Sequence, residues 1–194
     1  MTGKGSVNHN SRKFYAKNTD PERSSLNVEY CNENIKDVYH ELFDEALAQY
    51  NEKQTRSDRM IDNYYEKICS GKQEKPFHEI IVQIGNKDDM GAKTEDGQLA
   101  AKILDEYMQD FRRRNPTLRV FSAHLHMDEA TPHLHIDFIP YTTGSKRGLE
   151  TRVSLKKGIG RTRFQRRHKE RNRTQPVGGG RKRTACRYHA AAWH

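Results

Sequence analysis

The order of apolar and polar residues predicts one domain that mixes helices with strands. Apolar side chains recur every three or four positions in residues 35–50, 60–68 and 99–111, which is the spacing of one face of an α-helix. Gly71 ends the second of these helices, and Pro116 ends the third just after a run of three arginines. Three amphipathic helices are therefore expected.

The strands are shorter and are marked by alternation or by β-branched residues. Residues 26–30 alternate between apolar and polar positions, and residues 78–85 carry a β-branched run that predicts a buried strand inside the sheet. Residues 120–126 and the stretch after Pro132 alternate again. Together, these helices and strands predict an α+β fold.

The last two strands carry a cluster of histidines. In the segment HMDEATPHLH, His133 and His135 are two residues apart and share one face of a strand, so the apolar residues between and after them face the other way. An antiparallel neighbour ending in His126 would bring a third imidazole beside this pair. Three protein nitrogens can hold a metal and leave coordination positions open for a substrate. We therefore predict a catalytic metal centre at these histidines.

Composition limits the class of protein. The 194 residues are only 33% hydrophobic and 31% charged, which predicts one domain with a modest core. The sequence has no apolar run long enough to span a membrane and no apolar segment near its first residue, so we expect a soluble, cytoplasmic protein. Cys31, Cys69 and Cys186 are scattered and odd in number, which argues against a disulfide framework and against a cysteine metal site.

The formal charge of +9 is concentrated in one part of the chain. Residues 158–194 contain eleven lysines and arginines against one acid, Glu170, a balance of +10 that leaves −1 for the other residues. This tail has few large aliphatic residues and no periodicity, so it is predicted to be disordered and to bind nucleic acid only without specificity. Specific binding must come from the residues before it.

Two short motifs indicate a family when they are taken together. HNxR occurs at residues 9–12, and HxDExTPHxHxxxxP occurs at residues 126–140. The pair resembles the Pre/Mob family of plasmid relaxases, the MobV class, over roughly His9 to Lys157. The resemblance implies an HUH-type antiparallel sheet flanked by helices. It also implies a DNA strand transferase that nicks one strand at a plasmid's origin of transfer.

The resemblance implies roles for individual residues. The three clustered histidines would hold manganese or magnesium, although imidazole ligands also leave zinc open. Glu129 matches the candidate general base, and His9 matches the candidate nucleophile. Tyr15 is an alternative nucleophile, because other relaxases use tyrosine. The metal ligands implied are His126, His133 and His135, and the DNA contacts implied are Asn10, Arg12, Arg23 and Asn27.

Three further residues are expected to lie next to the metal ligands and to position them. By alternation, His124 and Asp137 lie on the same face as the metal ligands. Asp128, in the turn between the two strands, is expected to fix that turn or to orient a histidine.

The expected partner is plasmid DNA at the origin of transfer, single-stranded or supercoiled, and the expected form is a monomer. The resemblance places an incomplete catalytic domain at residues 1–157, followed by a tail at residues 158–194 whose composition fits an altered reading frame. Two other functions stay open. One is a DNA-binding remnant without catalysis, and the other is a metallohydrolase in which the histidines and Glu129 activate water.

Overall fold

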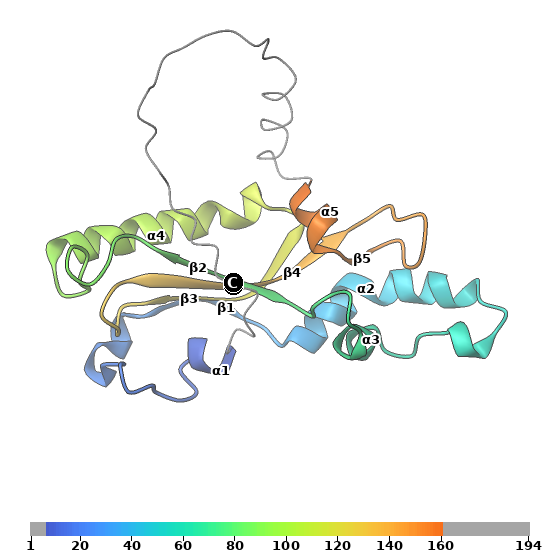
Figure 1. Ribbon diagram of the computed structural model, residues 1–194, viewed down its shortest axis with the longest axis horizontal. Coiled ribbons are helices and arrows are strands. Elements are labelled where there is room, and N and C mark those ends of the chain that lie inside the picture. Colours follow the sequence, from blue (N-terminus) through green and yellow to red (C-terminus); the bar gives the residue numbers. More distant parts are fainter. Residues whose placement is uncertain (1–6, 161–194) are drawn as a thin grey trace, which may run out of the picture.

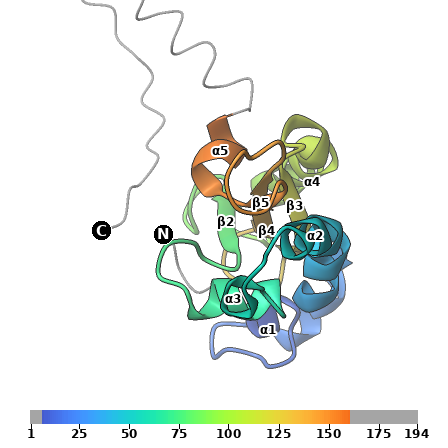
Figure 2. The same ribbon diagram turned by 90° about the vertical axis from the view of Figure 1, so that its right-hand side faces the viewer.

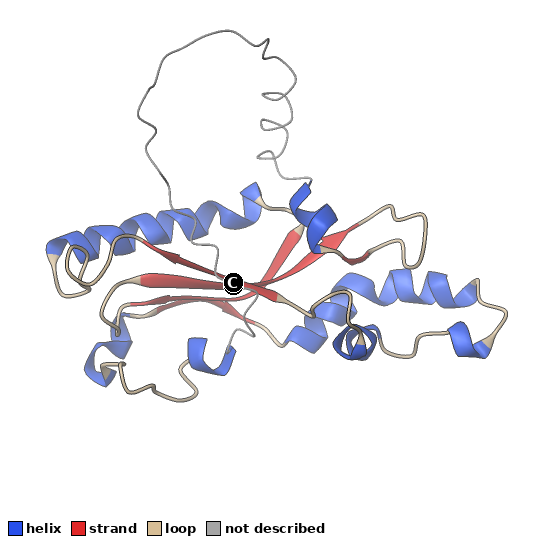
Figure 3. Cartoon of the chain, in the orientation of Figure 1, coloured by secondary structure: helices blue, strands red, loops and turns tan. Residues whose placement is uncertain are grey.

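The computed structural model describes residues 7–160, which form a sheet between two layers of helices (Figure 1, Figure 3). Helices α4 (Glu95–Arg114) and α5 (Leu155–Gly160) cover one face, called here the upper face. Helices α1 (Val7–Asn10), α2 (Ile35–Glu52) and α3 (Tyr64–Ser70) cover the lower face. Figure 2, turned by a quarter, again shows α4 and α5 above the strands and α1 and α3 below them. The predicted α+β fold is confirmed.

The sheet is antiparallel throughout. Its strand order is β1 (Val28–Asn32), β3 (Leu118–His126), β4 (His133–Thr142) and β2 (His78–Gln83), and a short strand, β5 (Arg152–Val153), pairs with the end of β4. The two central strands, β3 and β4, are the two that carry the histidines. They have a paired strand on each side and helices over both faces, so nearly all their residues are buried.

Strand β2 corrects one prediction, because it is an edge strand and not an inner one. Its β-branched residues divide between two environments. Ile80 and Val82 pack against the core above the sheet, whereas Ile81 faces the lower side and is 56% exposed. The β-branched run therefore reflects packing on one face, and it does not report how many strands flank it.

Two elements begin later than predicted. β1 begins at Val28 because Leu26 ends a 3-10 helix, η1 (Pro21–Leu26). α3 begins at Tyr64, where the side chain of Asn63 accepts a hydrogen bond from a backbone N–H of the first turn. Asparagine is a preferred N-cap for this reason, so the cap overrides the apolar spacing that began at residue 60. The helices predicted at residues 35–50 and 99–111 are confirmed within α2 and α4.

Each face of the sheet packs its own core. The upper core joins α4 to the apolar residues of β3 and β4, including Leu134, Ile136 and Phe138, which were predicted to face away from the histidines. The lower core occupies one end of the lower face, where Phe121 and Ile139 cluster with residues of α2 and α3. At the other end of the lower face, the same two strands carry histidines.

A β-bulge in β3 separates these two ends. Val120 and Ser122 pair with successive residues of β4, which leaves Phe121 as an extra residue. Val120 lies in the upper core and Phe121 in the lower core, and alternation then resumes so that His124 and His126 face down. The regular alternation predicted for residues 120–126 is therefore broken once, because a bulge adds one residue to one strand of a pair.

Three remaining predictions concern the rest of the chain. No helix within residues 7–160 is long and apolar enough to cross a membrane. Cys31 and Cys69 are free thiols, as expected, and Cys186 lies outside the described residues. The basic tail was predicted to be disordered. Its residues from 161 onward also lie outside the described residues.

Candidate functional site

Three histidines meet on the lower face, at the end of β3 and the start of β4. His126 is paired with His133 across the two strands, and His135 follows two positions later. The three ring centroids lie 5.2, 4.9 and 5.0 Å from one another. One ring nitrogen of each residue lies within 4.8 Å of those of the other two. The predicted convergence of the three imidazoles is confirmed.

One ring nitrogen of each imidazole lies within hydrogen-bond distance of an oxygen atom. His126 Nε2 lies 2.8 Å from the backbone carbonyl of Asn10, and His133 Nδ1 lies 2.8 Å from the carbonyl two residues before it. His135 Nδ1 lies 2.7 Å from the Glu79 carboxylate. Because a carbonyl or carboxylate oxygen only accepts, these nitrogens carry the protons. The opposite nitrogen of each neutral ring therefore keeps its lone pair.

Three converging imidazoles fit a divalent cation. Burial lowers the pKa of His126 to about 3 and also lowers the pKa of His133, so both rings are neutral ligands near pH 7. His126 Nδ1 is buried and has no hydrogen-bond partner within the described residues. A buried nitrogen in that condition calls for an explanation, and a metal ion supplies one.

Glu79 on β2 belongs to this centre, although the sequence analysis missed it. Its Oε1 accepts hydrogen bonds from His135 Nδ1 at 2.7 Å and from the Asn10 amide at 2.9 Å. Burial alone would raise the pKa of Glu79, but these two bonds outweigh it and lower that pKa. A carboxylate behind a ligand histidine fixes the orientation of its ring. The only sequence signal was a single acid within the β-branched strand.

Asn10 lies beneath the histidines and not at the surface. The residue is 2% exposed, and its amide also donates to Asp137 at 3.1 Å. Burial, together with the neighbouring charge of Glu79, raises the pKa of Asp137 to about 6. Asp137 and His124 face the lower side as predicted, and the His124 ring lies 6.2 Å from that of His126. The Asn10 side chain thus joins two carboxylates in this structure, and its implied contact with DNA stays a prediction.

Helix α1 carries His9 and then ends in a left-handed turn. The N–H groups of Arg12 and Lys13 donate to the carbonyls of His9 and Asn8 at 3.0 and 2.9 Å, the hydrogen-bond pattern of a Schellman ending. Arg12 occupies the left-handed position with a φ of 53°, where glycine is usual. A charged residue in this conformation costs stability, so its side-chain bonds must compensate.

His9, Arg12 and Glu129 form a second group beside the metal ligands. The His9 ring lies 6.2 Å from that of His126. His9 Nε2 is 3.2 Å from Arg12 Nη1 and 3.6 Å from Glu129 Oε1. Arginine can only donate, so this nitrogen accepts and carries the lone pair of the ring. Glu129 is held in turn by Arg12 at 2.9 Å and by Asn18 at 2.8 Å.

A pocket of about 320 Å³ opens between these two groups. It is lined by His9 and Glu129, by the metal-ligand candidates His133 and His135, and by Ile81 of β2, among others. The candidate nucleophile, the candidate base and two of the three candidate metal ligands therefore line one pocket. Tyr15 is not among the residues that line this pocket, and it is 56% exposed.

The turn between β3 and β4 is tied to the N-terminal segment, defined here as residues 7–27. Asp128 is fully buried and accepts hydrogen bonds from Arg12, Ser24 and Asn27. Burial would raise the pKa of Asp128, but these bonds lower it to about 2. Arg23 donates to two backbone carbonyls of the same turn at 2.6 and 3.0 Å. The prediction that Asp128 fixes the turn is confirmed.

The residues implied as DNA contacts therefore all have partners inside the protein. The side chains of Arg12 and Arg23 are only 10% and 18% exposed, and Asn27 bonds to the turn through both its amide oxygen and its amide nitrogen. In this structure their side chains bind the turn and Glu129. Sequence alone could not show this, because a polar segment that braces a site and one that binds DNA have the same composition.

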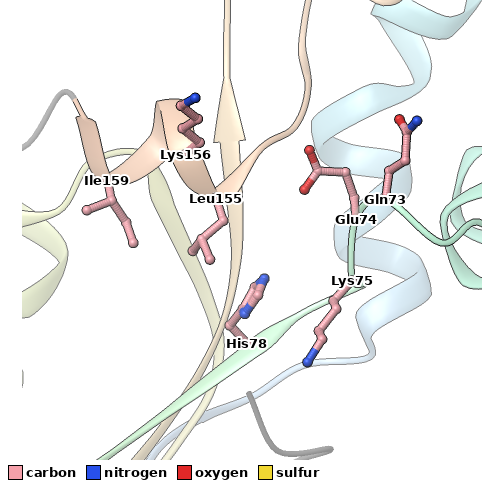
Figure 4. A pocket seen from close by; sticks show the side chains of 7 residues that line it. All are labelled: Gln73, Glu74, Lys75, His78, Leu155, Lys156 and Ile159. Atoms are coloured by element: carbon pink, nitrogen blue, oxygen red, sulfur yellow. The ribbon is translucent and has the colours of Figure 1, made fainter. Parts of the chain in front are cut away.

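A second pocket, of about 520 Å³, lies beside α5 on the upper face. In Figure 4, His78 of β2 points toward Leu155 of α5, and Glu74 lies on the other side of the opening. The described residues that line it include one histidine and one carboxylate, fewer than the three ligands of the lower-face cluster. The lower-face cluster is therefore the better candidate for a metal centre.

Two solved structures similar to this chain are of the MobM relaxase domain (MOBV; Mob_Pre) bound to plasmid pMV158 oriT DNA, in Mn-bound crystals at pH 5.5 and pH 4.6. The first is 23% identical, with a TM-score of 0.48, and the match covers 86% of this chain and 73% of that one. The second is 18% identical, with a TM-score of 0.42, and covers 95% and 87%. No curated protein sequence matched significantly.

The family model of the plasmid recombination enzymes (Mob_Pre) matches residues 10–178. The match includes most of the N-terminal segment, both central strands and the turn between them. It also continues beyond Lys157, where the resemblance was expected to end. Because this model matches most of the chain, the protein belongs to the Mob_Pre family of plasmid recombination enzymes.

Proposed function

We propose that this protein is a metal-dependent DNA relaxase that cuts one strand at a plasmid's origin of transfer by transesterification. The observation that carries the proposal is the shared pocket, in which His9 and Glu129 lie beside His133 and His135, two of the three histidines whose ring nitrogens converge. Membership of the plasmid recombination enzyme family supports the same reaction.

His126 would hold the metal through Nδ1, and His133 and His135 through Nε2, because these nitrogens keep their lone pairs. A bound divalent cation supplies positive charge that polarises a phosphoryl oxygen and stabilises the charge that develops during attack. Three nitrogen ligands accept manganese, magnesium or zinc, so the metal used must be measured. The MobM structures contain manganese, which is the first metal to test.

In the proposed step, the lone pair of His9 Nε2 attacks the phosphorus of the scissile phosphodiester. A phosphorus–nitrogen bond forms while one phosphorus–oxygen ester bond breaks, and the displaced oxygen leaves with the electron pair and becomes a hydroxyl. No water is consumed, so the covalent link retains the energy needed to rejoin the strand.

Glu129 would act as the base for the other proton of the His9 ring. In the neutral ring that proton lies on Nδ1, and it becomes acidic once Nε2 has bonded to phosphorus. Glu129, whose Oε1 lies 3.6 Å from His9 Nε2, would take this proton and later deliver it to the leaving oxygen. Arg12 contacts both residues and would hold them in register until a phosphate arrives. This arrangement makes His9 the preferred nucleophile, since Tyr15 lines no part of the same pocket.

The test is to incubate the protein and manganese with a supercoiled plasmid that carries its own origin of transfer, and to stop the reaction with detergent. We expect nicked circles with protein covalently attached, and no nicking after chelation. His9→Ala should bind metal normally but form no adduct, whereas Tyr15→Phe should form it. An adduct that survives in His9→Ala and is lost in Tyr15→Phe would reassign the nucleophile to Tyr15.

Two other outcomes would replace the proposal. Nicked circles without attached protein would indicate a metallohydrolase that uses water, because hydrolysis leaves no covalent link. DNA binding without nicking, by folded protein whose metal content has been measured, would indicate a remnant that binds the origin without cutting it. Repeating the assay with magnesium and with zinc identifies the metal that supports the reaction.

A further inference from the structure

Residues Lys13–Lys17 leave the active site as an exposed segment of aromatic and basic side chains. The sequence is KFYAK, and every residue except Ala16 is exposed. Phe14 is 51% exposed and Tyr15 is 56% exposed. The segment begins directly after the left-handed turn at Arg12, in the blue loop beside α1 in Figure 1. Two adjacent aromatic rings that face water do little for the core, so they call for another role.

The first of these rings touches the candidate nucleophile. The Phe14 ring centroid lies 5.6 Å from that of His9, whose side chain lines the pocket. Ile81, another exposed apolar residue, lines the same pocket from the edge strand β2. Ile81 at the pocket and Phe14 against His9 thus place two exposed apolar side chains next to a site rich in histidines. A phosphate gains nothing from such side chains, whereas the flat face of a nucleobase does.

The two lysines of the segment carry charge that no carboxylate within residues 7–160 neutralises in a salt bridge. Neither Lys13 nor Lys17 forms a salt bridge with any residue in the described range, whereas the arginines Arg12 and Arg23 nearby are both paired with carboxylates. Surfaces that bind single-stranded nucleic acid combine aromatic rings, on which bases stack, with cations that follow the phosphates. Lys13–Lys17 contains both within five residues.

We propose that Lys13–Lys17 is a docking segment for single-stranded DNA, in which Phe14 and Tyr15 stack on bases next to the scissile phosphate and Lys13 and Lys17 bind the flanking phosphates. The proposal rests on the proposed function, since it assigns the substrate strand to this side of the pocket. It also adds DNA contacts to the one implied for the buried Asn10.

The aromatic part can be tested without any cleavage. The probe is an oligothymidylate of roughly a dozen nucleotides, about one binding site, carrying a single fluorescent adenine analogue whose emission is quenched by stacking. With metal chelated, we expect quenching by the wild-type protein. Phe14→Leu and Tyr15→Leu should each weaken binding roughly 5- to 150-fold and reduce the quenching. Leucine at position 14 keeps an apolar side chain against His9, and Tyr15 is exposed, so both variants should fold.

Conservative variants separate stacking from other roles of the two rings. Phe14→Trp and Tyr15→Phe keep a flat ring and should quench as the wild type does. Leu99→Ala, at a residue that is 55% exposed on the upper-face helix α4, controls for the loss of an exposed apolar side chain. Wild-type binding and quenching by Phe14→Leu and Tyr15→Leu would overturn the proposal, as would an equal loss in the tryptophan and phenylalanine variants.

The role of the two lysines is tested by the salt dependence of DNA binding. Each phosphate neutralised on a single strand contributes about −0.7 to the slope of log affinity against log salt concentration. Replacing both Lys13 and Lys17 by glutamine should therefore make the slope shallower by about 1.4. The matched control replaces Lys102 and Lys156, exposed residues of α4 and α5, and should leave the slope unchanged. An equal change in both double variants would show general charge attraction and would exclude a docking segment.

These results are independent of the nicking assay. If nicking occurs but Phe14 and Tyr15 prove irrelevant to quenching, the relaxase proposal stands and the docking segment is rejected. If quenching depends on the two rings but no adduct ever forms, the segment binds DNA in a protein that does not cut it.

Discussion

The two ends of the lower face are built on the same strands but are held by different forces. At one end, Phe121 and Ile139 pack into an apolar core with α2 and α3. At the other end, the histidines are covered by the N-terminal segment through hydrogen bonds and ion pairs, with Asp128 and Glu79 as the main acceptors. Apolar packing depends on shape and volume, whereas the polar end depends on charge. The lower face thus separates its apolar core from the candidate metal centre.

The largest effect on activity is expected at the polar end. His126→Ala removes one of three metal ligands and should lower metal-dependent nicking at least about a hundred- to thousandfold, since electrostatic stabilisation of the transition state is lost. The circular dichroism spectrum should stay that of the wild type, because Leu125 and Leu134, the apolar neighbours of the histidines, face the upper core. An unfolded His126→Ala protein would show that the two ends are not separate.

The largest effect on stability is expected at the apolar end. Phe43 of α2 is fully buried in the lower core, so Phe43→Ala should lower the free energy of unfolding by about 3–5 kcal/mol. Metal affinity of the molecules that remain folded should be unchanged. Chemical denaturation and metal titration measure the two quantities on one sample. A parallel loss of metal affinity would mean that the lower core also shapes the site.

A smaller effect is expected from the carboxylate behind His135. Glu79→Gln removes the charge that orients this ring, and metal affinity should fall about 10- to 100-fold while the fold persists. Glu106→Gln, an exposed position on α4, is the matched control and should bind metal as the wild type does. Equal affinity in both variants would limit Glu79 to its hydrogen bond with Asn10.

The smallest effect is expected on the stability of the protein at acid pH. The pKa of Asp128 falls from its usual 3.8 to about 2 in the folded protein. Its ionised form therefore adds about 2 kcal/mol of stability above pH 4, which is lost as the pH falls toward 2. Asp128→Asn should remove this part of the pH dependence. Unfolding curves of the two proteins measured between pH 2 and pH 5 would be parallel if Asp128 contributed nothing.

The sequence was most informative where one pattern served both structure and chemistry. Alternation in the two central strands predicted the histidine face, its apolar reverse and the convergence on His126, because the period of a strand is fixed by backbone geometry. It did not predict the edge position of β2, and so it could not place Glu79 behind His135. Which strands become neighbours depends on the whole sheet.

The N-terminal segment shows where the sequence was least informative. Its motif identified His9, and the structure places that residue at the pocket. The partners of Arg12, Arg23 and Asn27 lie about a hundred positions away, and no local rule connects them. The resemblance therefore implied contacts with DNA for side chains that the structure shows bound to the β3–β4 turn. Contacts of this range are decided by tertiary packing.

The bulge at Phe121 has a consequence for how relatives of this chain can vary. A relative that lost this one residue would keep every pairing beyond it, and with it the direction of the histidines, but would lose an anchor beneath α2 and α3. A relative that gained a residue after Ser122 would turn His124 and His126 toward α4 instead. A deletion at the bulge is thus expected to lower stability, whereas an insertion beyond it is expected to remove two histidines from the lower face. The two ends of this strand can vary separately because the bulge shifts the alternation of their side chains by one residue.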